Sequence, residues 1–174
     1  IMSGRIVFIL IILLSLAGCE KDKKRLSGTD TIDNNLYGAG PYYAIGFSFS
    51  EGKTVPTTPR PGPDITIDND GTISNLILQA TNLNNSFFKT GEYADESAAR
   101  QAFDALTEIQ VSQWEPWAFG IKPYQVWIFR TGLDTYAKFR IISTVSEAGA
   151  SRDYAECTFE WVYQPDGSLT FPPK

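Results

Sequence analysis

The sequence contains few of the side chains that enzymes use to move protons or hold metal ions. Histidine is absent, and the single methionine is Met2 near the N-terminus. Ser-His-Asp and Cys-His catalytic arrangements are therefore impossible, and zinc sites built on histidine are excluded. The two cysteines, Cys19 and Cys157, are too few for a thiolate cage. These residue types argue against metal-dependent or histidine-based chemistry.

Carboxylates are the remaining candidates for acid–base chemistry. The 20 acidic residues show no spacing that singles out a catalytic pair. Residues 68–73 (DNDGTI) are similar to the middle of a calcium-binding EF-hand loop, but the first and twelfth positions would be Thr66 and Ile77, where acidic ligands are required. Asp70-Gly71 fits a hairpin turn better. We therefore predict that the protein is not an enzyme.

Four aromatic residues form the candidate ligand-binding site: Trp114, Trp117, Phe119 and Tyr124. They lie in a segment interrupted by proline and glycine, where flat side chains can form the wall of an apolar pocket. Large aromatic side chains are also often buried simply to close the end of a core. Both interpretations are open at this point.

The regular elements that must position these residues are mainly β-strands. Alternation of apolar and polar residues or a β-rich composition predicts strands over residues 42–51, 65–67, 73–79, 125–131, 135–145 and 156–164. The stretch 126–129 is apolar on both faces and should lie centrally between two layers. Residues 54–63, rich in threonine and proline, should form a surface loop. Cys157 shares the parity of its apolar neighbours, which favours a buried structural thiol.

One helix is expected over residues 96–109, with Asp95 or Ser97 near its cap. Its apolar stripe consists of Ala99, Ala102, Phe103, Leu106 and Ile109. The predicted fold class is therefore mainly β, an antiparallel two-layer β domain over residues 41–174 with one covering α-helix.

The N-terminus has the organisation of a secretory signal. Arg5 precedes an apolar stretch over residues 6–16, which is too short to span a bilayer comfortably and ends in small residues before Cys19. The motif Leu16-Ala17-Gly18-Cys19 resembles the lipobox of bacterial lipoproteins. That resemblance implies a signal peptide over residues 1–18, cleavage before Cys19 and acylation of Cys19 as a membrane anchor in the cell envelope.

Residues 19–40 are polar and charged, and we expect them to form a lipidated flexible tether. Removal of residues 1–18 takes away only Arg5, which leaves 14 basic and 20 acidic residues and a formal charge of −6. An acidic chain is a poor candidate for binding nucleic acid.

The order of elements resembles the HmuY family of bacterial surface lipoproteins, whose founding members bind haem. The resemblance rests on residues 47–55 (FSFSEGKTV), 64–65 (DI), 125–131 (QVWIFRT), 136–141 (YAKFRI) and 158–168 (TFEWVYQPDGS). It implies an outer-membrane, surface-exposed protein that captures haem and passes it to an outer-membrane receptor.

The iron ligands of that family are histidines or methionines, and the mature chain contains neither. A bound haem would have to use a tyrosine oxygen, the Cys157 thiolate or no protein ligand. The expected function is therefore a non-enzymatic binder of haem or another flat apolar ligand. The alternative is a structural or protein-interaction envelope lipoprotein without a small-molecule ligand.

Overall fold

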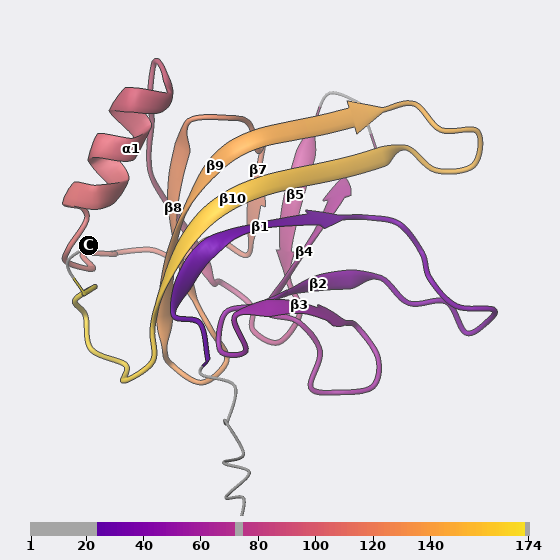
Figure 1. The fold of residues 1–174 in the computed structure, drawn as a ribbon, viewed down its shortest axis with the longest axis horizontal. Coiled ribbons are helices and arrows are strands. Elements are labelled where there is room, and N and C mark those ends of the chain that lie inside the picture. The colour runs from indigo at the N-terminus through magenta and orange to yellow at the C-terminus, as the bar shows by residue number, and fades with distance from the viewer. Residues whose placement is uncertain (1–23, 72–74, 173–174) are drawn as a thin grey trace, which may run out of the picture.

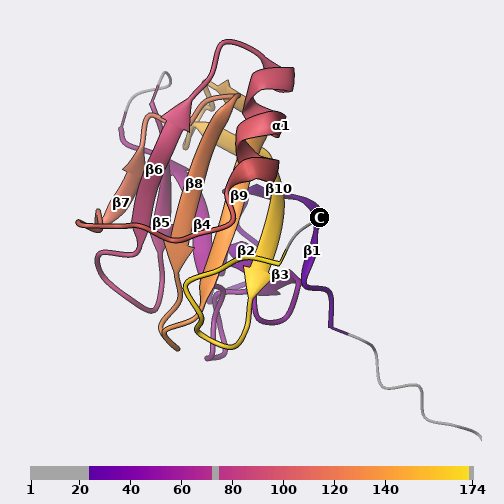
Figure 2. The same ribbon diagram turned by 90° about the vertical axis from the view of Figure 1, so that its left-hand side faces the viewer.

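A computed structural model of the chain describes residues 24–71 and 75–172. These residues form two five-stranded antiparallel β-sheets and one α-helix (Figures 1 and 2). The predicted fold class, a mainly β antiparallel two-layer domain with one covering helix, is confirmed. The predicted signal peptide and Cys19 lie outside the described residues.

The first sheet, called here the helix-covered sheet, consists of β1 (Ser27–Asp33), β10 (Tyr154–Gln164), β9 (Tyr136–Glu147), β8 (Gln125–Arg130) and β6 (Phe87–Glu92), in that order. The second sheet consists of β3 (Lys53–Pro56), β2 (Ile45–Ser48), β4 (Ile65–Asn69), β5 (Leu76–Ala80) and β7 (Trp117–Phe119). Figure 2 shows α1 (Glu96–Ala105) on the outer face of the first sheet.

The core between the two sheets is largely aromatic. Phe47 lies 5.1 Å from Trp161 between ring centroids, and Phe49 lies 5.4 Å from Phe129. All four side chains are buried. Such pairs stabilise the core through their large apolar area and through the favourable geometry of tilted rings.

Strand β8 contributes to two layers at once. Trp127 and Phe129 face the second sheet, whereas Val126 and Ile128 belong to the cluster beneath α1. A strand with apolar side chains on both faces needs a cover on both faces. The prediction that residues 126–129 lie centrally is therefore confirmed.

Two buried cations help to hold α1 on the sheet. Lys138 Nζ donates to the backbone oxygens of Phe103, at 2.7 Å, and Leu106, at 2.8 Å. Beside it, Arg140 is fully buried, forms an ion pair with Glu160 at 2.8 Å and lies 3.8 Å from the carboxylate of Glu96 in α1. Lys138 thus satisfies carbonyls at the C-terminal end of α1, where intrahelical donors are missing.

The helix is shorter than predicted. Asp95 caps its N-terminus by accepting a hydrogen bond from the Ala98 N–H, as expected, but α1 ends at Ala105 rather than at residue 109. Ile109 is still buried, because the Ile109 N–H donates to the Leu169 oxygen and this bond fixes the segment against the C-terminal end of the chain. Within the described part of the chain, α1 included, no helix has the length and apolarity needed to cross a membrane.

The strand boundaries require three corrections. Residues 27–33, assigned to the flexible tether over residues 19–40, form β1 because β10 supplies a complete antiparallel partner. Residues 54–56 of the predicted loop belong to the edge strand β3, where a proline is tolerated because one side of the strand is unpaired. The strand predicted over residues 42–51 is confined to β2.

The remaining strand predictions agree better with the structure. β4 and β5 pair as a hairpin around Asp70-Gly71, although residues 72–74 lie outside the description. β8, β9 and β10 match the three predicted strands over residues 125–164. β6 and β7 were not predicted.

A candidate ligand-binding groove

The groove forms where the chain crosses from one sheet to the other. After α1, Glu115 makes an isolated two-hydrogen-bond bridge with Phe87 of β6, with N···O distances of 2.7 and 3.0 Å. The chain then enters the second sheet, where Trp117, Ala118 and Phe119 pair with β5. Edge strands of both sheets, β6 and β7, are thereby brought next to each other.

Strand alternation leaves two large aromatic side chains on the surface. Ala118 is fully buried, whereas Trp117 and Phe119, which point the other way, are 47% and 49% exposed. Their rings make an edge-to-face contact with centroids 5.4 Å apart. The pair forms a rigid aromatic platform, since both backbone positions are held in the sheet.

The platform lines one wall of a shallow groove of about 380 Å³. The complete lining is Phe88, Lys89, Gln113, Glu115, Trp117, Phe119 and Trp127. Lys89 Nζ lies 5.7 Å from the centroid of the Trp127 ring and 4.0 Å from Glu92 Oε2. The groove therefore combines aromatic walls with an ammonium group and the carboxylate of Glu115.

Trp114 lies elsewhere, although it is only three residues from Trp117. It belongs to the layer beneath α1, where its ring stacks on Tyr136 with centroids 6.2 Å apart. The Arg130 guanidinium lies 5.2 Å from the same ring. Trp114 is thus a packing residue of the helix-covered face and does not line the groove.

Tyr124 is also absent from the groove lining. Its backbone has a φ of 70°, its N–H donates to the Ile141 oxygen, and its oxygen accepts from the Tyr93 N–H. Both hydrogen-bond distances are 3.1 Å, so this residue leads the chain into β8. Of the four candidate residues, the structure brings Trp117 and Phe119 together and leaves Trp114 and Tyr124 outside.

The predicted site did not include five residues that line the groove: Phe88, Lys89, Gln113, Glu115 and Trp127. Phe88 and Lys89 belong to β6, whose alternation is interrupted by a register shift between Lys89 and Gly91. The Phe87-Phe88 doublet is the sequence signal that could have identified this strand, because aromatic residues are enriched in strands.

Cys157 is fully buried between the sheets, so the predicted structural role of its thiol is confirmed. Burial also raises its pKa well above the ordinary value for cysteine. A protonated thiol without solvent access is not available to a ligand in the groove. Cys157 is therefore not a residue of the groove.

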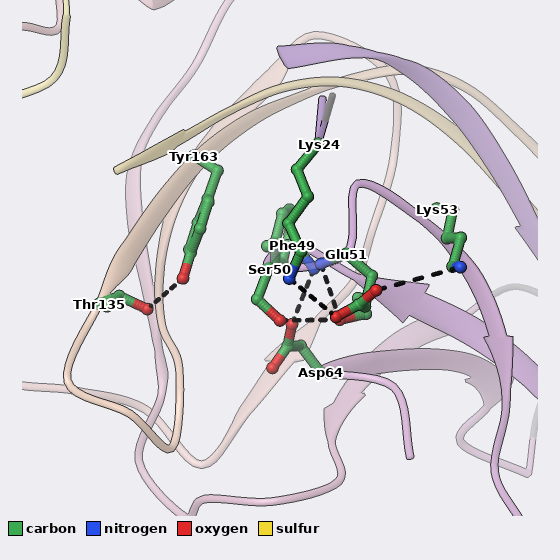
Figure 3. A network of polar contacts seen from close by, with 9 residues as sticks. Lys24, Phe49, Ser50, Glu51, Lys53, Asp64, Thr135 and Tyr163 are labelled. Carbon is green, nitrogen blue, oxygen red and sulfur yellow. Dashed lines mark hydrogen bonds and ion pairs between the residues drawn. The ribbon is translucent and has the colours of Figure 1, made fainter. Parts of the chain in front are cut away.

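A second cavity, of about 470 Å³, lies between the β2–β3 turn and the β8–β9 turn, and its lining includes Lys24, Asp64 and Leu133. Asp64 Oδ2 accepts a hydrogen bond of 2.7 Å from the Phe49 N–H (Figure 3). Burial raises the pKa of Asp64 above its usual value, although hydrogen bonds from the turn act in the opposite direction. At the rim, Lys24 pairs with Glu51 at 3.1 Å.

The two cavities differ in what they can bind. The groove offers flat apolar surface with one ammonium group, Lys89, and one carboxylate, Glu115, which suits a planar molecule whose acidic substituent lies at the Lys89 side. The Asp64 cavity presents a carboxylate already engaged by the adjacent turn, which suggests a structural role. Among the described residues, no group of three or more Cys, Asp or Glu side chains is arranged to hold a metal ion.

Comparison of the sequence with models of known protein families and with characterised proteins finds no match.

Proposed function

We propose that the protein is a non-enzymatic binding lipoprotein of the bacterial outer membrane, and that the groove between β6 and β7 binds haem or a related flat, apolar ligand. The observation that carries the proposal is the pair Trp117 and Phe119. Both are about half exposed although each has a buried neighbour in Ala118. Large exposed aromatic surface beside a groove is characteristic of a binding site rather than of a packed core.

The lining residues fit a tetrapyrrole in two respects. The Trp117 and Phe119 rings can cover part of the macrocycle face, and Lys89 can pair with a propionate. A groove of about 380 Å³ is small among ligand pockets, which typically measure roughly 300–1,000 Å³. It would cover only part of a porphyrin, so we expect weak binding, with a Kd of roughly micromolar order.

The lining contains no side chain that commonly coordinates haem iron. We therefore expect the metal to make little difference to affinity. Haemin and iron-free protoporphyrin should bind with similar Kd values, and the haemin complex should lack the low-spin spectrum of bis-histidine or histidine–methionine ligation. The resemblance to the HmuY family supports the ligand class and a receptor as partner, while the groove suggests a mode of capture that depends on stacking.

The test is a titration of the purified mature protein with haemin and with protoporphyrin, followed by tryptophan fluorescence and by porphyrin absorbance. Trp117→Ala should weaken binding of both ligands about tenfold or more, because stacking on an aromatic side chain contributes about 1–3 kcal/mol. Trp114→Ala is the matched control, since that ring packs against Tyr136 away from the groove. It should leave both Kd values unchanged.

Two outcomes would contradict this function. Equal loss of binding in the Trp114 and Trp117 variants would show that the groove is not the site. Absence of binding by either porphyrin would favour the alternative, an envelope protein whose exposed aromatic pair on the edge strand β7 contacts another protein.

A further inference from the structure

We infer that one end of the molecule, bounded by Lys24 and the β8–β9 turn, rests on the surface of a phospholipid bilayer and inserts Leu133 and Leu26 among the lipid head groups. This inference rests on the proposed anchoring at Cys19. It adds an orientation to that proposal, since it assigns the face of the β domain that meets the membrane.

The first argument is the position of the anchor. Lys24 is the first described residue and follows Cys19 by five positions. A chain extends at most about 3.5 Å per residue, so Lys24 lies no further than about 17 Å from an acylated Cys19. Lys24 and Leu133 line the same cavity, which places the β8–β9 turn at the same end of the molecule. Figure 1 shows this turn and the start of β1 at the lower end of the domain.

The second argument is that Leu133 is highly exposed on a turn held by hydrogen bonds. Its side chain is 76% exposed, more than any other large hydrophobic side chain in the described part. The turn that carries it is held by a hydroxyl network, in which Thr131 Oγ1 accepts a hydrogen bond of 3.2 Å from the Leu133 N–H. The Thr135 hydroxyl is 2.7 Å from Thr131 Oγ1. It also lies 2.8 Å from the Tyr163 hydroxyl, a contact drawn in Figure 3.

Thr131, Thr135 and Tyr163 are all buried, so the turn has a fixed conformation. Leu26, which is 45% exposed, adjoins the same network because its backbone oxygen accepts from the Tyr163 N–H at 2.7 Å. A rigid turn that keeps a leucine in water carries an unfavourable hydration cost, which insertion as far as the boundary between head groups and acyl chains would reduce.

The charges at this end favour insertion over electrostatic adsorption. Lys24 and Lys53 both pair with Glu51, and Arg25 pairs with Asp30. With Asp64 in the cavity and the exposed Asp134 beside Leu133, four acidic side chains face three basic ones, so an anionic membrane gains no extra attraction. We therefore expect the contact to depend weakly on the proportion of anionic lipid.

The test places an environment-sensitive label at Leu133 and at a control site. Leu133→Cys and Leu36→Cys are each labelled with a nitrobenzoxadiazole dye, while the buried Cys157 remains unreactive. Leu36 is 53% exposed and follows the opposite end of β1, a seven-residue strand about 20 Å long. The full protein, purified with its native anchor, is reconstituted into phosphatidylcholine vesicles, with and without phosphatidylglycerol.

On reconstitution, the dye at position 133 should shift its emission to shorter wavelength, gain intensity severalfold and be quenched by spin-labelled lipid. The dye at position 36 should show none of these changes. Equal responses at the two positions, or no response at position 133, would overturn the inference.

A second arm separates this inference from the anchoring proposal. In this arm, a hexahistidine segment replaces the acylated cysteine at the N-terminus of the mature chain. The protein is then bound to vesicles that contain nickel-chelating lipid. In parallel, intact-mass analysis measures the acylation state of the native protein. If the native protein carries no acyl chains, the anchoring proposal fails. The tethered arm still decides whether the Leu133 end contacts the bilayer, by the same comparison of positions 133 and 36.

Discussion

Asp64 is a half-buried carboxylate that accepts hydrogen bonds from a turn, although its burial disfavours the ionised form. Its Oδ2 accepts from the Phe49 N–H, and further hydrogen bonds come from Ser48 and Ser50. Burial outweighs these bonds, so the pKa is raised above its usual value of 3.8. The protonated form is therefore favoured in the folded protein more than in the unfolded chain.

This shift predicts a pH dependence of stability with a defined sign. The contribution of Asp64 is fully present below about pH 3.8, its unfolded value, and is lost as pH rises through the higher folded value. Asp64→Asn stays neutral, so the free energy of unfolding of the wild type should fall relative to the variant as the pH rises above about 3.8. Urea unfolding across this range measures the difference.

Asp166→Asn provides a control of opposite sign. The Ser168 N–H donates to Asp166 Oδ1 at 2.8 Å and lowers the pKa of this exposed carboxyl group. The wild type should therefore gain stability relative to this variant as pH rises through the acidic range. A parallel trend for both substitutions would contradict the assignment to Asp64.

At the scale of elements, the helix depends on a strand for its C-terminal end. Helix α1 has no basic residue in its last turn. Lys138 of β9 supplies the missing charge by donating to the oxygens of Phe103 and Leu106, and its ammonium group lies 4.7 Å from the centroid of the Phe103 ring. The sheet thus fixes both the position and the end of the helix.

Substitution of this lysine should detach the end of the helix. Lys138→Met keeps an apolar side chain of similar length but leaves two backbone oxygens without their donor, and we expect a loss of about 1–3 kcal/mol in the free energy of unfolding. Lys53→Met is the matched control, because Lys53 is exposed and its pair with Glu51 is 4.0 Å long. That change should cost about 0–1 kcal/mol. Equal losses in urea unfolding would argue against the role of Lys138.

At the scale of the whole molecule, the proposals assign separate surfaces to separate tasks. The aromatic groove lies at the adjoining edges β6 and β7, whereas the anchored end is formed by the first described residues and the β8–β9 turn. A chain attached at its N-terminus could rest on the bilayer at one end and keep the groove in contact with solvent.

Acylation of Cys19 should decide where the protein resides. Cys19→Ala should move the protein from the membrane fraction to the soluble fraction and remove the mass of the acyl chains, because a lipid anchor needs this thiol. Cys157→Ala should leave the protein in the membrane, since the Cys157 thiol is buried in the core. Membrane fractionation and intact-mass analysis provide the readouts. An unmodified Cys19, or a mature N-terminus at another residue, would refute the anchor.

The sequence by itself was sufficient for the features that depend on local pattern. Alternation and apolar runs predicted β8, β9, β10 and the β4–β5 hairpin, because a half-buried or fully buried strand imposes its own period on the residues. The same reasoning placed Cys157 in the core and the start of α1 near Asp95 or Ser97, of which Asp95 is the cap, because a short polar side chain can accept from a free N–H.

Only the tertiary structure decided which aromatic residues share a surface. Trp114 and Trp117 are three positions apart, but they lie in different layers because the chain crosses between the two sheets at Glu115. The local sequence pattern does not indicate this crossing. The groove that Trp117 lines also includes Phe88 and Lys89 of β6, which are distant from it in sequence. The sequence of β1 is likewise typical of a polar linker. These residues form a strand because they pair with the edge of β10. Contacts between distant segments are set by the packing of the two sheets, so these features could not be predicted from local composition.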